Sequence, residues 1–128
     1  MKINMNNPKL TEEESKNLQQ MIANIEAGEM SQVEDLFSNC NNPYQFAKTH
    51  SNYVKDWEKT KKKLEDNLKN NILPPNTSLA FSEALIEESD KIINQKLRMV
   101  QMLFMAKFNE SIFNYLGSDG KTKFLGIF

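Results

Sequence analysis

The sequence predicts an all-α protein, a four-helix bundle-like domain with a long central C-terminal helix and a short apolar tail. Three observations lead to this prediction. Apolar side chains recur at helical spacing in four segments. Residues that cap helix N-termini stand before these segments. The prolines and glycines lie at the ends of the segments or outside them. With 128 residues the chain fits one domain with one compact core, so we assign residues 1–128 to a single helical domain.

Local signals place the ends of the helices. Thr11 caps the first helix, and Glu14 stands where it completes a capping box. We expect Gly28 to end that helix, because glycine readily adopts the left-handed conformation that follows helix C-termini. Asn42 before Pro43 is a typical helix start, since Asn caps well and proline loses no hydrogen bond at the first position. The predicted helices are residues 11–27, 31–39, 43–72 and 77–116.

The last of these segments is predicted to be the central helix. It contains neither Gly nor Pro, and between Met99 and Phe108 only Gln101 and Lys107 are polar. Such a segment needs cover from other helices on nearly every side. Over about 39 residues at ~1.5 Å each it would be roughly 58 Å long, whereas a compact domain of this size has a radius of gyration of about 14 Å. We therefore expect it to kink, or to project and offer its apolar surface to a second molecule.

Both ends of the chain, residues 1–10 and 117–128, are predicted to be flexible or docked tails. The sequence closes on Phe-Leu-Gly-Ile-Phe, residues 124–128, and such apolar side chains are unusual at a terminus. Two interpretations stay open. The tail folds back onto the bundle, or it is a docking peptide that inserts into a partner.

The residues offer little for catalysis or for binding a metal or cofactor. A single histidine, His50, excludes paired-histidine metal sites, and a single cysteine, Cys40, excludes an internal disulfide. Residues 117–122 end like a phosphate-binding loop, but Tyr115 stands where that motif needs glycine, and no helix follows. We therefore predict no cofactor, no metal and no catalytic residue, and interpret the protein as a non-enzyme.

Charge and hydropathy narrow the expected partners. The net charge is −1, and the basic run at residues 59–63 is bordered by acidic residues and lacks arginine. Such a run is typical of an exposed helix with local ion pairs, so a nucleic-acid-associated regulator is the least favoured function. No segment has the length and apolarity of a membrane span or a signal peptide. We expect a cytoplasmic protein, with leaderless secretion left open.

These patterns favour a protein-binding module, such as a small adaptor, a chaperone or an assembly subunit. Methionine-rich helix faces adapt to different partner helices. The expected partners are a client protein and a second copy of this chain in a homodimer. The third predicted helix has an a/d-like spacing of the kind found in coiled coils. The alternative is a leaderless secreted or virus-like effector that inhibits a host enzyme by inserting the tail. The candidate partner-binding residues are Met99, Met102, Leu103, Met105, Phe108, Ile112, Phe113, Tyr115, Phe124, Leu125, Ile127 and Phe128.

Overall fold

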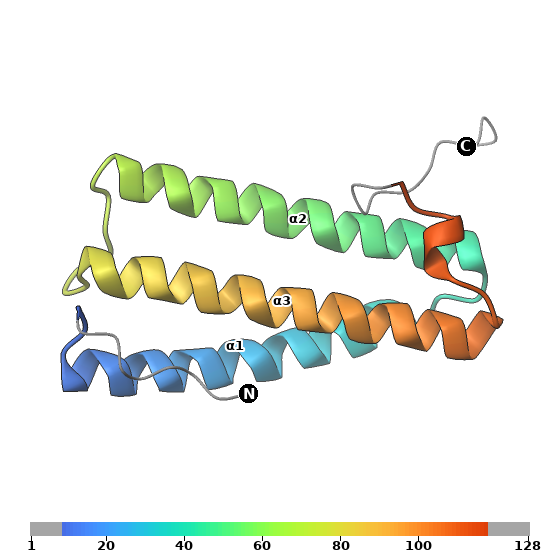
Figure 1. Ribbon diagram of the computed structural model, residues 1–128, viewed down its shortest axis with the longest axis horizontal. Helices are drawn as coiled ribbons and strands as arrows, with labels where there is room; N and C mark the ends of the chain where they lie inside the picture. Colours follow the sequence, from blue (N-terminus) through green and yellow to red (C-terminus); the bar gives the residue numbers. More distant parts are fainter. Residues whose placement is uncertain (1–8, 118–128) are drawn as a thin grey trace.

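The computed structural model describes residues 9–117, which form three long α-helices and one short 3-10 helix (Figure 1). The prediction of an all-α protein is confirmed, but the prediction of four helices is wrong. No helix among the described residues combines the length and apolarity needed to cross a bilayer. The elements are α1 (Glu12–Ser38), α2 (Pro43–Lys69), α3 (Leu79–Phe108) and η1 (Ile112–Asn114).

Helix α1 joins the two segments that we predicted as separate helices. Gly28 lies inside α1 and does not end it, and Ser31, where we predicted a second helix to begin, lies within the same helix. The reason is the apolar face on both sides of the glycine, where Ile22, Val33 and Phe37 are all buried. A glycine inside a helix costs about 1 kcal/mol relative to alanine, and burying one large apolar side chain stabilises by more than that. Tertiary packing therefore carries the helix through Gly28.

The predicted N-terminal caps are confirmed. The Thr11 hydroxyl accepts a hydrogen bond from the Glu14 amide, and the Glu14 carboxylate accepts one from the Thr11 amide, each at 3.1 Å. The Asn42 side chain caps α2 with Pro43 at its first position. Ser78 caps α3, and its hydroxyl donates to the Glu14 carboxylate at 2.6 Å. The starts of α1 and α3 therefore lie side by side, and these two helices run in the same direction. Helix α2, which lies between them in the sequence, runs in the opposite direction.

Two helices end earlier than predicted. Helix α2 stops at Lys69 and not at residue 72, and Asn71 just beyond it has a positive φ of 57°. Helix α3 stops at Phe108 and not at residue 116, because Asn109 adopts the left-handed conformation with φ 54°. Asparagine tolerates this conformation better than most residues. The chain then folds back, and Ile112 is buried.

The expected length of about 39 residues for the last helix is therefore wrong. Helix α3 has 30 residues and the other two have 27 each, so at ~1.5 Å per residue all three are roughly 40–45 Å long. Helix α3 is nevertheless the central element, as predicted. It packs against both α1 and α2, which contact each other little (Figure 1).

The buried residues form two clusters where the sequence predicted one compact core. The smaller cluster lies between α1 and α3 and contains Leu18, Ile22, Phe81 and Ile92. A polar layer involves all three helices: Lys96 lies 3.8 Å from the Glu26 carboxylate, and the Tyr53 hydroxyl donates to Glu29 at 2.7 Å. The larger cluster draws on all three helices and on the segment after α3; it comprises Val33, Phe37, Cys40, Phe46, Ala47, Tyr53, Ile93, Val100, Phe104, Ile112 and Leu116.

Candidate protein-binding site

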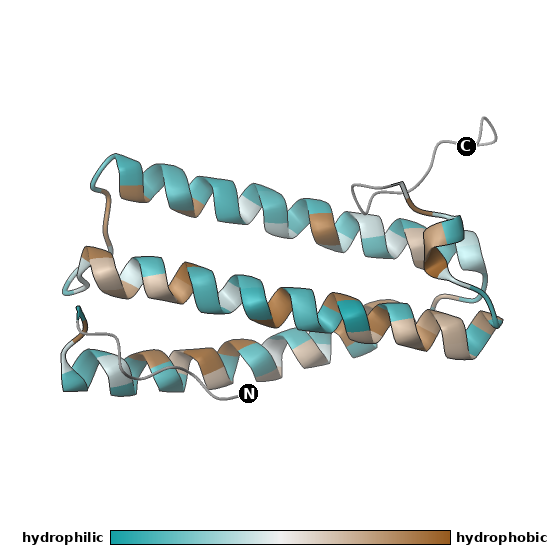
Figure 2. Cartoon of the chain, in the orientation of Figure 1, coloured by the Kyte–Doolittle hydropathy of each residue, from teal (hydrophilic) through white to brown (hydrophobic). Residues whose placement is uncertain are grey.

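The outward face of α3 changes from polar to apolar along its length. In the first part of the helix, exposed positions are occupied by residues such as Glu87, Lys91 and Gln95. After Arg98 the exposed positions hold Met102, which is 73% exposed, and Met105, which is 48% exposed. Val100 and Phe104, on the opposite side of the same turns, are fully buried. The C-terminal part of α3 is therefore apolar on its solvent side as well as its core side (Figure 2).

Two further side chains extend this surface. Leu103 is 48% exposed and Phe113, in η1, is 54% exposed. We call Met102, Leu103, Met105 and Phe113 the apolar patch. Single exposed apolar residues are normal on a protein surface, but several gathered at one end of a helix are a mark of an interaction site. A hollow lies on either side of the patch.

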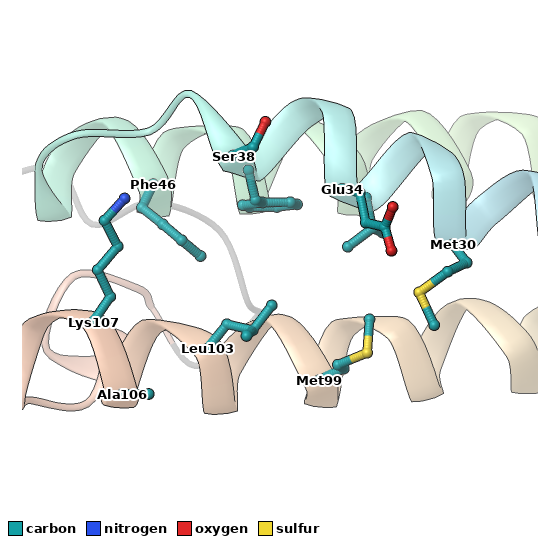
Figure 3. A pocket seen from close by; sticks show the side chains of 10 residues that line it. Met30, Glu34, Ser38, Phe46, Met99, Leu103, Ala106 and Lys107 are labelled. Carbon is teal, nitrogen blue, oxygen red and sulfur yellow. The ribbon is translucent and has the colours of Figure 1, made fainter.

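The first hollow is a groove between α1 and α3, which we call the α1–α3 groove (Figure 3). Its volume is about 690 Å³. The side chains of Val33, Phe37 and Phe46 are buried, whereas Leu103 is half exposed. Glu34 lies toward one end, and Lys107 lies toward the other. The lining residues are Met30, Val33, Glu34, Phe37, Ser38, Phe46, Met99, Leu103, Ala106 and Lys107.

The second hollow lies between α3 and η1, and we call it the α3–η1 hollow. Its volume is about 540 Å³. Ile112 is buried, while Phe113 remains exposed beside it. The hollow exists because the chain turns back after Asn109 and lays η1 beside the last turns of α3. Its lining residues are Arg98, Gln101, Met102, Met105, Ala106, Ser111, Ile112 and Phe113.

Contacts between aromatic rings hold this end of the bundle together. Phe46 packs on Phe37 with ring centroids 4.8 Å apart and meets Phe104 edge to face at 5.3 Å. Tyr115 meets Tyr44 edge to face at 5.0 Å. Such pairs contribute about 0.5–1.5 kcal/mol each beyond the area they bury. Phe37 and Phe46 line the α1–α3 groove, so these contacts hold part of its wall in place, which lowers the entropic cost of binding there.

Charged groups at this end are also held in place. Lys107 donates to the backbone carbonyl of Cys40 at 2.6 Å, which ties α3 to the turn after α1. The Tyr115 hydroxyl donates to the Glu110 carboxylate at 2.9 Å. This hydrogen bond, together with partial desolvation, raises the pKa of Tyr115. Glu110 is thereby oriented just beyond the end of α3.

The candidate residues predicted from the sequence divide into four groups. Met99 and Leu103 line the α1–α3 groove, and Met102, Met105, Ile112 and Phe113 line the α3–η1 hollow. Phe108 and Tyr115 are half-buried against the larger cluster and serve mainly as core. The last four, Phe124, Leu125, Ile127 and Phe128, lie outside the described residues.

The sequence prediction missed the residues that α1 and α2 contribute to the groove. Met30, Val33, Phe37 and Phe46 line it together with α3. The apolar spacing of α1 continues across Gly28, and this was the available signal. Because the helix was divided at that glycine, the signal was not followed. No local pattern shows that this face lies beside α3.

Other residues singled out in the sequence have packing roles. Lys61, within the basic run, lies 3.4 Å from the Asp90 carboxylate on α3, which also accepts a hydrogen bond from the Trp57 indole at 2.8 Å. His50, the single histidine, is only 1% exposed and lies 3.3 Å from the Gln101 amide. Within residues 9–117, no three His, Cys, Asp or Glu side chains are arranged to hold a metal ion.

No protein-family model matches the chain, and no match was found among curated proteins or solved structures.

Proposed function

We propose that this protein is a non-enzymatic protein-binding module whose α1–α3 groove receives an amphipathic helix of a partner protein. The observation that carries the proposal is the groove itself, about 690 Å³ in volume and lined mainly by apolar side chains from all three helices. Apolar surface left open to water in this way becomes stabilising when a partner covers it.

The size of the groove fits a short stretch of helix. Its walls run from Met30 to Ser38 on α1 and from Met99 to Lys107 on α3, so each spans roughly 12 Å, or about two helical turns. A helix with large apolar residues at positions i, i+4 and i+7 presents side chains over that length. Met30 and Met99 have flexible side chains that adjust to the shape of such residues.

The charges at the groove favour one class of partner helix. Glu34 lies toward one end and Lys107 toward the other (Figure 3). A helix with a basic residue near Glu34 and an acidic residue near Lys107 would meet opposite charges at both ends, which favours one orientation over its reverse. A module of this kind acts as an adaptor, a chaperone or an assembly subunit.

Selection of helical peptides on the full-length chain tests this proposal. A library of displayed helical peptides would carry varied residues on one helical face. Peptides that bind the natural chain would be kept, and peptides that also bind the Leu103→Glu variant would be removed. We expect enrichment of large apolar residues at i, i+4 and i+7, with bound peptide shifting the NMR signals of the Met30 and Met99 methyl groups.

A matched variant makes the result specific to the groove. Leu36 on α1 is 39% exposed and does not line the groove. Leu103→Glu should weaken peptide binding by at least about tenfold, because a carboxylate would lose its hydration in an apolar groove, and Leu36→Glu should leave affinity unchanged. Equal binding to both variants, or no enriched peptide, would reject the proposal.

A further inference from the structure

We propose that the outward face of α3 binds a second copy of this chain in an antiparallel, twofold-symmetric pair. In this arrangement Met102 packs against Met105 of the second copy, and Arg98 pairs with Glu110 of the second copy. This face adjoins the α1–α3 groove but is separate from it, so the inference goes beyond the proposed function and does not depend on it.

The spacing of residues along the face is itself symmetric. Four residues of α3 and its C-cap follow one another at intervals of four, three and four positions, so all four lie on one side of the helix. They are Arg98, Met102, Met105 and Asn109. The midpoint of this row falls between the two methionines. A twofold axis at that midpoint places each methionine opposite the other methionine of the second copy. The same axis places Arg98 opposite the end of α3, where Asn109 and Glu110 stand.

Arg98 begins this row, and Glu110 follows directly after its last residue, Asn109, so charges of opposite sign stand at its two ends. Arg98 is exposed and makes no ion pair with another described residue. The Glu110 carboxylate is oriented by the Tyr115 hydroxyl at 2.9 Å and the Asn114 amide at 3.4 Å, and retains capacity to accept from a guanidinium. The C-terminal end of a helix also carries partial negative charge, which favours a cation there. Lys107, the basic residue in the last turn of α3, donates to the Cys40 carbonyl.

The shape of the surface provides room for the second copy. The α3–η1 hollow of about 540 Å³ opens beside Met102 and Met105, with the buried Ile112 also lining it. A methionine side chain from the second copy can enter it, because methionine is unbranched and adapts to irregular spaces. Met102, at 73% exposure, is the residue whose environment changes most when the pair forms.

Sedimentation velocity on the full-length chain, from about 1 µM to about 1 mM, tests the proposal in the range expected of a modest interface. We expect a reversible monomer–dimer equilibrium. Arg98→Glu and Glu110→Lys should each weaken the dimer by about tenfold or more, because each places like charges opposite each other twice. An equimolar mixture of the two variants should restore dimerisation, since both contacts in the mixed pair then join opposite charges.

Controls separate this geometry from a general effect of charge. Lys48→Glu and Glu65→Lys make the same charge changes at exposed positions of α2 and should leave the dimer unchanged. Met102→Lys should yield a monomer with an unaltered circular dichroism spectrum, because the side chain is mostly exposed. A chain that stays monomeric throughout, or variants whose mixture does not regain dimerisation, would overturn the proposal. Peptide binding in the groove would be unaffected by either result, so failure of one proposal is distinguishable from failure of the other.

Discussion

Gly28 is a residue whose local preference and structural position disagree. It lies inside α1, it is exposed, and a Cβ added to it would meet no atom within 4 Å. Alanine would thus gain helix propensity and lose nothing in packing. We expect Gly28→Ala to raise the free energy of unfolding by about 0.5–1 kcal/mol, measured by urea denaturation. A decrease would show that α1 needs a break at this residue.

Tyr53 on α2 provides a pH-dependent contribution to stability through its hydrogen bond to Glu29 on α1. Burial and the hydrogen bond to Glu29 both raise its pKa above the ordinary value. The neutral phenol is thus favoured in the folded state. Its contribution to stability is present below the unfolded-state pKa of about 10 and is lost as pH rises above that value.

Alkaline unfolding tests this contribution. We expect the free energy of unfolding to fall as the pH is raised from about 9 to about 11, and to fall less steeply in Tyr53→Phe, which has no phenol to ionise. Urea denaturation at several pH values measures both slopes. Identical slopes for the two proteins would mean that the Tyr53 pKa is the same in the folded and unfolded states.

At the scale of the element, the end of α3 determines which surface the protein exposes. Asn109 has a left-handed backbone, and its amide donates to the Met105 carbonyl at 2.9 Å. This stop is what turns η1 back beside α3. If the helix continued, Ile112 and Phe113 would project along it and the α3–η1 hollow would not form.

Substitution of Asn109 tests this role. Asn109→Gly should be neutral or slightly stabilising, whereas Asn109→Val should lower the free energy of unfolding by about 1–2 kcal/mol, because a β-branched side chain clashes in the left-handed region. Thermal and urea denaturation report the difference. If valine were tolerated as well as glycine, the end of α3 would not depend on this conformation.

At the scale of the whole molecule, the buried apolar side chains form two clusters and not one. Ile22 belongs to the smaller cluster and Ile112 to the larger one. Ile22→Val and Ile112→Val should each cost about 0.5–1.5 kcal/mol. Their effects should add to within about 0.5 kcal/mol in the double variant, because the residues share no cluster. A larger coupling energy, measured by a double-mutant cycle in urea, would show that the clusters act as one core.

Prediction from the sequence succeeded where the signal was local. The capping residues Thr11 and Asn42 were recognised because a cap depends on side chains within three residues of it. It failed at Gly28, where a cost of about 1 kcal/mol was outweighed by the burial of Val33 and Phe37 far along the chain. It failed again at Asn109, because the predicted helix was continued through this residue to residue 116.

The same distinction applies to the candidate site. The apolar character of their segment made five of these residues candidates, and their role in binding stays a prediction. They are Met99, Met102, Leu103, Met105 and Phe113. Their division between the α1–α3 groove and the α3–η1 hollow was not predictable, since it depends on which helix lies on either side of α3.

The sequence by itself determined the all-helical class, the starts of the three helices and the apolar character of the segment that forms the last half of α3, because propensity, capping and periodicity act over a few residues. Only the tertiary structure decided that α1 is continuous, that α3 stops at Phe108, and that α1 and η1 flank its exposed methionines. These features depend on contacts between residues distant in the sequence, whose burial outweighs the local preferences of single residues such as Gly28.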